Sequence, residues 1–262
     1  MKAHLSFPLA QVSYRAIRVW QRNLDTFLRL WTTESWPPFI EPVMYIAAMG
    51  FGLGAYVTQI EGLSFLQFIA PAFVATAAMF VASFECTFGS FVRMEYQKTF
   101  DAIIATPLNI EEVIAGEILW GATRAVFAAV GVLVIIAFFG LIQSPWALVA
   151  LPIALLEGLM FASLAMLFTA IAPAIDAFNY YITLGITPMF LFSGVFFPLS
   201  QLPQPVQALA WLSPLTHAVS LQRALALGRL SWGLAWDTLW MAVVALLALN
   251  GALALMHRRL IK

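Results

Sequence analysis

Long apolar runs alternate with short polar connections along almost the whole chain. Each run has about 20 or more mainly apolar residues, the length that an α-helix needs to cross the hydrocarbon core of a bilayer. Most of the charged residues fall outside these runs. The pattern therefore predicts an all-α integral membrane protein with six transmembrane helices. Their approximate ranges are 38–59, 66–90, 113–141, 146–172, 178–198 and 233–256.

A different periodicity precedes the first run. Between Val12 and Trp31, apolar residues recur every three or four positions, and basic residues recur on the opposite face of the same helix. The apolar stripe comprises Val12, Ala16, Val19, Trp20, Leu24, Phe27, Leu28 and Trp31, and the polar stripe Arg15, Arg18, Arg22, Asp25 and Arg29. A basic amphipathic helix with Trp on its apolar face is typical of a helix that lies along a membrane surface.

The connection 91–112 reads FVRMEYQKTFDAIIATPLNIEE and contains a helical pattern of its own. Its apolar residues at helical spacing are Tyr96, Phe100, Ile103 and Ile104. Pro107 ends this pattern because it disfavours helical backbone at the preceding residue. Asn109 followed by Glu112 then resembles a capping box that opens the third span. We expect a short cytoplasmic helix here, between the second and third spans.

The connection 199–228 is long and interrupted by proline at 203, 205 and 214. The prolines separate two apolar pieces that are each too short to cross a bilayer. Such pieces are expected as re-entrant or interfacial helices, here on the outer side of the membrane.

Composition excludes a water-soluble globular protein. Apolar residues make up 62% of the 262 residues and charged residues 10%, and the mean hydropathy is +0.90, whereas soluble domains are about 45–50% apolar and about 25% charged. Six spans use most of the length, which leaves no room for an additional soluble domain of about 100 residues. The net charge of +0 gives no electrostatic footprint for nucleic acid.

Lys and Arg are unevenly distributed among the connections. Five stand in the N-terminal 35 residues, Arg93 and Lys98 in the second connection, and three in the C-terminal tail. The connections 60–65 and 142–145 have none. Positive charge gathers on the cytoplasmic side, so both termini are expected in the cytoplasm, which requires an even number of spans. Six satisfies this requirement.

Ionisable residues inside the predicted spans are candidate functional groups because burying them in lipid is costly. Glu41 and Glu117 lie near the cytoplasmic boundary, where snorkelling explains them. Arg124 and Glu157 fall at similar depth in adjacent antiparallel spans, which suggests an intramembrane pair; the alternative is two independent residues facing a water-filled gap. Glu85, near the inner end of span two, either lines a cavity open to the cytoplasm or bonds to a neighbouring helix.

Catalytic patterns are weak. His217 stands in the outer connection with no acid nearby in the sequence, the next downstream being Asp237, and lone Cys86 lies in an apolar run. A phosphate-binding loop of the form G-x-x-x-x-G-K does not occur. We therefore expect no catalytic residue, no cofactor and no metal in this chain, and any ATP hydrolysis must come from another chain.

Aromatic residues crowd into the first, second and fifth spans. Stacked rings could form an apolar surface along which sugars and acyl chains move. The alternative interpretation of any single ring is that it packs against another helix or contacts lipid. The candidate pathway residues, with one acidic neighbour, are Tyr45, Tyr56, Phe80, Phe84, Glu85, Phe192 and Phe196.

Three blocks of sequence resemble the membrane subunit of type 2 ATP-binding-cassette exporters, and within that family the nodulation-factor export (NodJ) branch. They are EPVMYIAAMGFGLGAYV (41–57), the stretch from FIAPAF to GATRA (68–125), and TPMFLFSGVFFPLSQLP with PLTHAVSLQRALALG (187–203 and 214–228). The similarity covers nearly the whole chain, from about residue 36 to 256.

The resemblance implies a half-permease in the bacterial inner membrane that pairs with a second copy of itself and binds two copies of a cytoplasmic ATPase subunit, which carries ATP and Mg²⁺. Residues 1–35 would be the cytoplasmic connecting helix and 36–262 the six-span domain. The helix Arg93 to Thr106 would be the coupling helix. Residues placed by this resemblance in the ATPase groove are Tyr96, Lys98, Thr99, Phe100 and Asp101.

The resemblance further implies a pathway at the dimer interface between spans one, two and five, for an amphipathic, lipo-oligosaccharide-like cargo. A drug, a lipid or a polysaccharide is the alternative cargo. Two other classes of function stay open. A membrane-embedded transferase would use His217 with a carboxylate, and an ion-driven transporter would need paired intramembrane carboxylates and inverted repeats, of which the two halves of the sequence show no sign.

Overall fold

Four helices of the computed structural model are long and apolar enough to cross a membrane. The structure describes residues 12–34, 36–57 and 59–261, and every structural statement below concerns these residues. The four helices coincide with the predicted spans 66–90, 113–141, 146–172 and 233–256, which are thereby confirmed as long apolar helices. They are Phe65–Tyr96, Ile110–Phe138, Pro145–Ile171 and Gly233–Leu260.

The two other predicted spans, 38–59 and 178–198, are shorter helices. Helix α2 covers Pro37–Phe51, and one helical stretch covers Phe178–Phe192. Each has about 15 residues, which extend about 22 Å, less than the hydrocarbon core of about 30 Å. The total of six spans therefore stays a prediction.

The described elements follow one another in this order along the chain. They are α1 (Ala16–Glu34), α2 (Pro37–Phe51), η2 (Leu53–Ala55), β1 (Gln59–Ile60), β2 (Leu63–Ser64), α3 (Phe65–Phe84), η3 (Glu85–Gly89), η4 (Val92–Tyr96), α4 (Thr99–Ile104), α5 (Ile110–Phe138), η5 (Pro145–Val149), α6 (Ala150–Ile171), η6 (Ile175–Ala177), α7 (Phe178–Tyr180), η7 (Tyr181–Ile186), α8 (Thr187–Phe192), η8 (Leu199–Gln201), α9 (Gln204–Leu212), α10 (Pro214–Leu227) and α11 (Gly233–Leu260).

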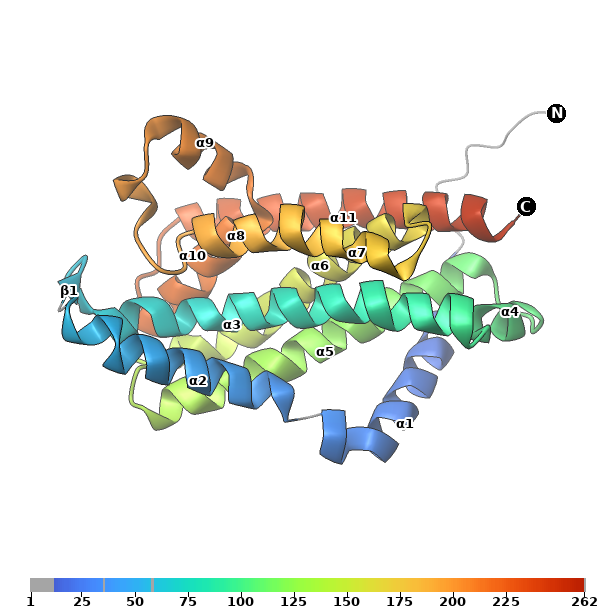
Figure 1. Ribbon diagram of the computed structural model, residues 1–262, viewed down its shortest axis with the longest axis horizontal. Helices are drawn as coiled ribbons and strands as arrows, with labels where there is room; N and C mark the ends of the chain where they lie inside the picture. The colour runs from blue at the N-terminus through green and yellow to red at the C-terminus, as the bar shows by residue number, and fades with distance from the viewer. Residues whose placement is uncertain (1–11, 35, 58, 262) are drawn as a thin grey trace.

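The long helices lie along the long axis of the molecule (Figure 1). Helix α6 is at the centre and packs against α11, α5 and α3. The short helix α4 and the C-terminal end of α11 lie at one end, called the α4 end here, and the β1–β2 hairpin and α9 lie at the opposite end, called the hairpin end (Figure 1). Many apolar side chains on the outer faces of the helices are exposed, among them Val134 and Leu247, as expected for surfaces that contact lipid.

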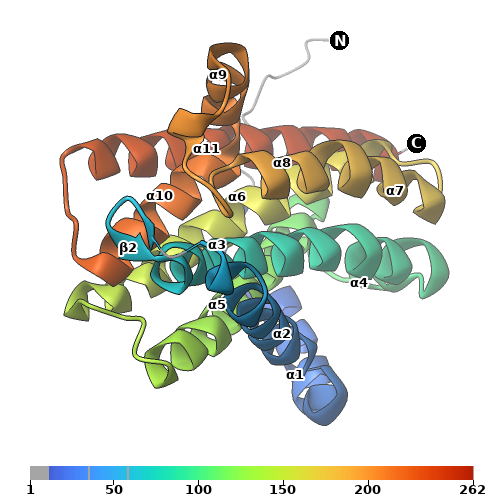
Figure 2. The same ribbon diagram turned by 60° about the vertical axis from the view of Figure 1, so that its left-hand side comes forward.

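Helix α1 confirms the amphipathic helix predicted in the N-terminal segment. It packs against α5 at the α4 end, and α2 crosses in front of α3 and α5 (Figure 2). A Cβ atom on Gly116 of α5 would lie 2.6 Å from Val19 Cβ, so glycine allows the two helices to touch. The apolar stripe is divided, because Val19 and Phe27 are buried against α5 whereas Leu28 and Trp31 are exposed.

The connections confirm several local predictions. Helix α5 begins at Ile110, and Glu112 accepts the backbone N–H of Asn109 at 2.8 Å, as the capping box required. The segment 199–228 forms the two short helices α9 and α10, and α10 ends at Leu227 and is capped by Gly228 with φ +72°, a left-handed conformation that suits glycine.

Some predictions fall on residues outside the described part. These are the start of the N-terminal segment, residues 1–11 and 35, the last residue of the basic tail, Lys262, and the side chain of Glu41. The boundary predicted between residues 35 and 36 stays a prediction.

Candidate functional site

Glu117 of α5 is fully buried and accepts hydrogen bonds from three side chains. Asn23 of α1 donates to one carboxylate oxygen at 2.8 Å, and Ser90 donates to the other at 2.8 Å. Arg93 reaches this second oxygen with Nε at 2.9 Å and Nη2 at 2.7 Å, and its Nη2 also lies 2.9 Å from Glu85. We call these five residues the Glu117 cluster. The prediction that Glu117 snorkels towards the membrane surface is therefore wrong. Its buried carboxylate instead joins α1, α5 and the end of the second span.

A π-helical turn brings the second span into this cluster. The helix that begins as α3 widens at η3, Glu85–Gly89, before it reaches Arg93. Such turns occur frequently at functional sites. A Cβ atom on Gly89 would lie 3.0 Å from Glu85 Oε1 and 3.4 Å from the Arg93 guanidinium. Glycine therefore leaves room for the ion pair across the turn.

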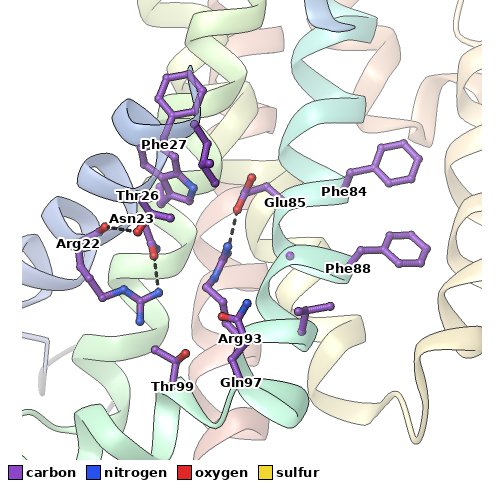
Figure 3. A pocket seen from close by; sticks show the side chains of 14 residues that line it. Arg22, Asn23, Thr26, Phe27, Phe84, Glu85, Phe88, Arg93, Gln97 and Thr99 are labelled. Carbon is purple, nitrogen blue, oxygen red and sulfur yellow. Dashed lines mark hydrogen bonds and ion pairs between the residues drawn. The ribbon is translucent and has the colours of Figure 1, made fainter. Parts of the chain in front are cut away.

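A cavity of about 650 Å³ lies between α1 and this part of the second span, and we call it the α1 cavity (Figure 3). Gln97 and Thr99 lie at one end of it and Phe27 at the other, with the charged side chains between them (Figure 3). The rings of Phe84 and Phe88 point away from the Arg93–Glu85 pair (Figure 3). The α1 cavity thus changes from polar to apolar along its length. Its lining residues also include Arg22, Asn23, Thr26, Leu30 and Trp120.

The predicted coupling helix Arg93 to Thr106 is not one helix. The second span continues through η4 to Tyr96, the chain turns at Lys98 with φ +52°, and α4 covers only Thr99–Ile104. Tyr96, Lys98 and Asp101 are exposed, and Thr99 is half-buried. Phe100 is fully buried, and its placement in the ATPase groove stays a prediction. Helical spacing placed it correctly on the apolar face, but that face packs on the protein itself.

Basic residues near the C-terminal end of α11 hold this end of the molecule together. Arg259 of α11 donates to the backbone oxygens of Thr169 and Ala172 at 2.6 and 2.7 Å and to Glu95 at 2.9 Å. His257 lies 2.6 Å from Glu111 of α5. These contacts join the ends of four long helices around the exposed 97–106 segment. Only their contacts in space reveal them, because Arg259 and Glu95 are 164 positions apart.

The predicted pathway residues divide into two groups. Tyr45, Phe80 and Phe196 gather around Phe190, with ring centroids 6.2, 5.5 and 5.0 Å from it. The side chains of Tyr56, Phe84 and Phe192 are instead exposed. Glu85 belongs to the Glu117 cluster described above.

The predicted Arg124–Glu157 pair does not form. Arg124 lies 3.7 Å from Glu85 and over the ring of Phe27. Glu157 is fully buried, and neither of its carboxylate oxygens has a hydrogen-bond partner among the described residues. The cause is helix rotation, because α5 and α6 touch where a Cβ atom on Gly158 would lie 2.8 Å from Ala122 Cα. Arg124, two residues further on, is turned by about 200° from that contact.

Comparison with known proteins identifies the family. The model of the ABC-2 type transporter family matches residues 15–227. The chain is 37% identical over 245 residues to "Nodulation protein J" of Sinorhizobium fredii, covering 94% of each protein. It is 41% identical over 212 residues to the protein of the same name from Rhizobium leguminosarum bv. trifolii, covering 81% of each. "Inner membrane transport permease YadH" of Escherichia coli is 27% identical over 203 residues, which are 77% of this chain and 78% of that protein.

The chain belongs to the ABC-2 type transporter family. It is a multi-pass membrane protein and a permease of the type 2 class.

The hairpin end of this permease contains a His–Asp contact between residues that are far apart in the sequence. His217 Nδ1 lies 2.7 Å from Asp237 Oδ1, although 20 residues separate them, and Ser220 donates to the other oxygen of Asp237 at 3.0 Å. His217 Nε2 lies 2.9 Å from the backbone oxygen of Trp211. Because both ring nitrogens are engaged, neither is available as the general base that a transferase would need. We therefore interpret this contact as one that holds α10 to α11.

Proposed function

We propose that this permease is the transmembrane half of an ATP-driven exporter. Two copies would assemble with two copies of a separate cytoplasmic ATPase subunit, which would bind ATP and Mg²⁺ and supply the energy. The family assignment supports this proposal, as does the absence of a phosphate-binding loop from the sequence.

The proposal includes six membrane crossings, with both termini in the cytoplasm. Helix α2 and the stretch Phe178–Phe192 would complete the six, assisted by the residues that flank them and by local thinning of the bilayer. The α4 end would be the cytoplasmic end. In favour of this orientation, the basic residues Arg258 and Arg259 lie in the last turn of α11, which ends there, and Arg15 directly precedes α1.

The observation that carries the proposal is the exposed 97–106 segment at the point where four long helices are joined. Its side chains Lys98 and Asp101 are exposed and carry opposite charges, which suits a protein partner. Directly after the segment, the backbone oxygen of Pro107 accepts a hydrogen bond at 2.8 Å from Arg15, the residue that precedes α1. A partner that moves this segment would therefore move the ends of the spans, and so alternate inward and outward access. We call residues 97–106 the coupling segment.

The pathway in this proposal lies at the interface between the two copies, near the aromatic group around Phe190. Aromatic rings offer apolar contact without demanding a fixed hydrogen-bond geometry. The cargo would be an amphiphile of the lipo-oligosaccharide type, because several relatives are named Nodulation protein J. A drug, a lipid or a polysaccharide is the alternative cargo, since the printed name of the relative YadH states no cargo.

The test reverses the two exposed charges of the coupling segment. Lys98→Glu and Asp101→Lys are expected to abolish most of the stimulation of ATP hydrolysis by cargo, and the export itself, while the thermal stability of the permease stays unchanged because both side chains are exposed. Arg258→Glu, an exposed charge at the same end, is the matched control and should export normally. Unchanged stimulation and export in both coupling-segment variants would overturn the proposal. Failure to co-purify any ATPase would overturn it more generally.

A further inference from the structure

Arg22 has an unusual position in the α1 cavity. Its Nη2 donates to Asn23 Oδ1 at 2.7 Å. Its Nη1 is buried and has no hydrogen-bond partner among the described residues. A buried guanidinium nitrogen that makes no hydrogen bond is costly, so the wall of the cavity lacks one hydrogen-bond acceptor beside Arg22.

The neighbouring carboxylates do not supply that acceptor. Glu117 already accepts from Asn23, Ser90 and Arg93. Glu85 is engaged by Arg93 at 2.9 Å. Burial lowers the pKa of Arg22 from its ordinary value, and the nearby positive charge of Arg93 lowers it further, although Glu117 acts in the opposite direction. Guanidinium groups stay protonated in proteins, so Arg22 remains a cation.

The walls of the cavity beyond Arg22 suit a ligand with two unlike parts. The amide of Gln97 and the hydroxyls of Thr26 and Thr99 offer hydrogen bonds around the guanidinium. Phe27 and Leu30, further along α1, offer apolar surface. Figure 3 shows Thr99 below Arg22 and Phe27 above it. The volume of about 650 Å³ falls within the range of ordinary ligand sites, about 300–1,000 Å³.

We propose that the α1 cavity binds the acidic head group of an amphiphile, with Arg22 as its anchor and Phe27 and Leu30 in contact with the start of its apolar chain. The head group carries a phosphate, sulfate or carboxylate, the acceptors that a guanidinium binds in a bidentate manner. The bound head group contacts Gln97 and Thr99 of the coupling segment. The further statement that this amphiphile is the exported cargo rests on the exporter function proposed above, whereas binding itself does not.

Binding is measured on the whole purified permease in phosphatidylcholine nanodiscs, without any ATPase. The probes are a short-chain phosphatidic acid, the phosphatidylcholine with the same chains, and inorganic phosphate, each quantified by native mass spectrometry. Phosphatidic acid is expected to bind at least about tenfold more tightly than either of the other two. The choline of phosphatidylcholine cancels the net charge of its head group and leaves its phosphate fewer free oxygens for a bidentate contact, and inorganic phosphate lacks the apolar chain.

Arg22→Gln is expected to weaken the binding of phosphatidic acid at least about tenfold, and Arg22→Lys to weaken it less. Arg18→Gln is the matched control on the same helix, because Arg18 is exposed and does not line the cavity. Should Arg22→Gln fail to fold, Thr26→Glu replaces it. Thr26 is exposed, and a carboxylate four residues after Arg22 would pair with it along the helix and displace the ligand.

Three results would overturn the proposal. The first is that Arg22→Gln, or Thr26→Glu where that variant replaces it, binds phosphatidic acid as tightly as the unmodified permease does. The second is that the unmodified permease binds phosphatidylcholine as tightly as phosphatidic acid. The third is that it binds inorganic phosphate as tightly as phosphatidic acid, which would make the cavity a site for free anions. If binding follows the expectation but no acidic amphiphile stimulates the ATPase complex, the head-group site stands and the assignment of the cargo fails. The two proposals can therefore fail separately.

Discussion

Arg259 at the end of α11 donates to the carboxylate of Glu95, 2.9 Å away in η4, and thereby joins the last span to the second span just before the coupling segment. The same guanidinium donates to two backbone oxygens at the end of α6 and lies over the ring of Phe91. One side chain thus fixes three helix ends.

Replacing this arginine should loosen the α4 end. Arg259→Gln is expected to lower the free energy of unfolding by about 1–3 kcal/mol, because two carbonyl oxygens at the end of α6 lose a charged donor; the ion pair with partly exposed Glu95 adds little. Thermal unfolding of the purified permease measures the loss. Arg258→Gln is the control, since Arg258 is exposed. Equal melting temperatures for the two variants would contradict the expectation.

The two fully buried acidic side chains, Glu117 and Glu157, should respond in opposite ways to replacement by glutamine. Glu117→Gln leaves Arg93 without its closest ionic partner and is expected to cost about 3–5 kcal/mol. Glu157→Gln is expected to leave stability within about 1 kcal/mol of the original, or to raise it, because no described group donates to that carboxylate. Melting temperatures of the two variants, purified in parallel, provide the comparison.

A charge exchange extends this test. Combining Arg124→Glu with Glu157→Arg should recover none of the stability lost through Arg124→Glu alone, because the two side chains do not meet. Recovery in the double variant would restore the intramembrane pair that the sequence suggested.

The close contact between α5 and α6 should be sensitive to a single methyl group. Gly158→Ala is expected to cost about 1–3 kcal/mol, because its Cβ would lie 2.8 Å from both Ala122 Cα and Ala125 Cβ. Gly185→Ala is the matched control, since a Cβ there meets no atom within 4 Å. Comparable expression and melting temperature for both variants would show that the two helices can separate at no cost.

The sequence was sufficient to predict the long helices and their approximate ends. A run of some 20 apolar residues has few alternatives in a membrane protein, and local signals such as Asn109 with Glu112 marked the start of α5 correctly. The shorter lengths of α2 and of Phe178–Phe192 were not visible, because the apolar runs continue beyond the residues that are helical.

The contacts of the candidate site depend on how each helix is rotated about its own axis, and the sequence specifies this only weakly in apolar helices. Arg124 and Glu157 were matched by depth alone and proved to point in different directions. Phe100 showed helical spacing, yet its spacing did not reveal whether the apolar face meets a partner or the protein's own core. Arg22 was recognised only as one of several arginines on α1, and only the α1 cavity distinguishes it from exposed Arg18.

The π-helical turn at Glu85–Gly89 makes the site depend on chain length as well as on residue type. A π turn contains one residue more than an α turn, so a single-residue deletion there would let the helix rewind regularly. Because the wide turn already holds the extra residue, its loss there would leave later side chains such as Arg93 near their places. The same deletion in the regular part of α3 would swing every later side chain of the span by roughly 100°, carry Arg93 away from Glu117 and re-aim the coupling segment. A deletion should thus be far less harmful in the π turn than in the regular helix before it.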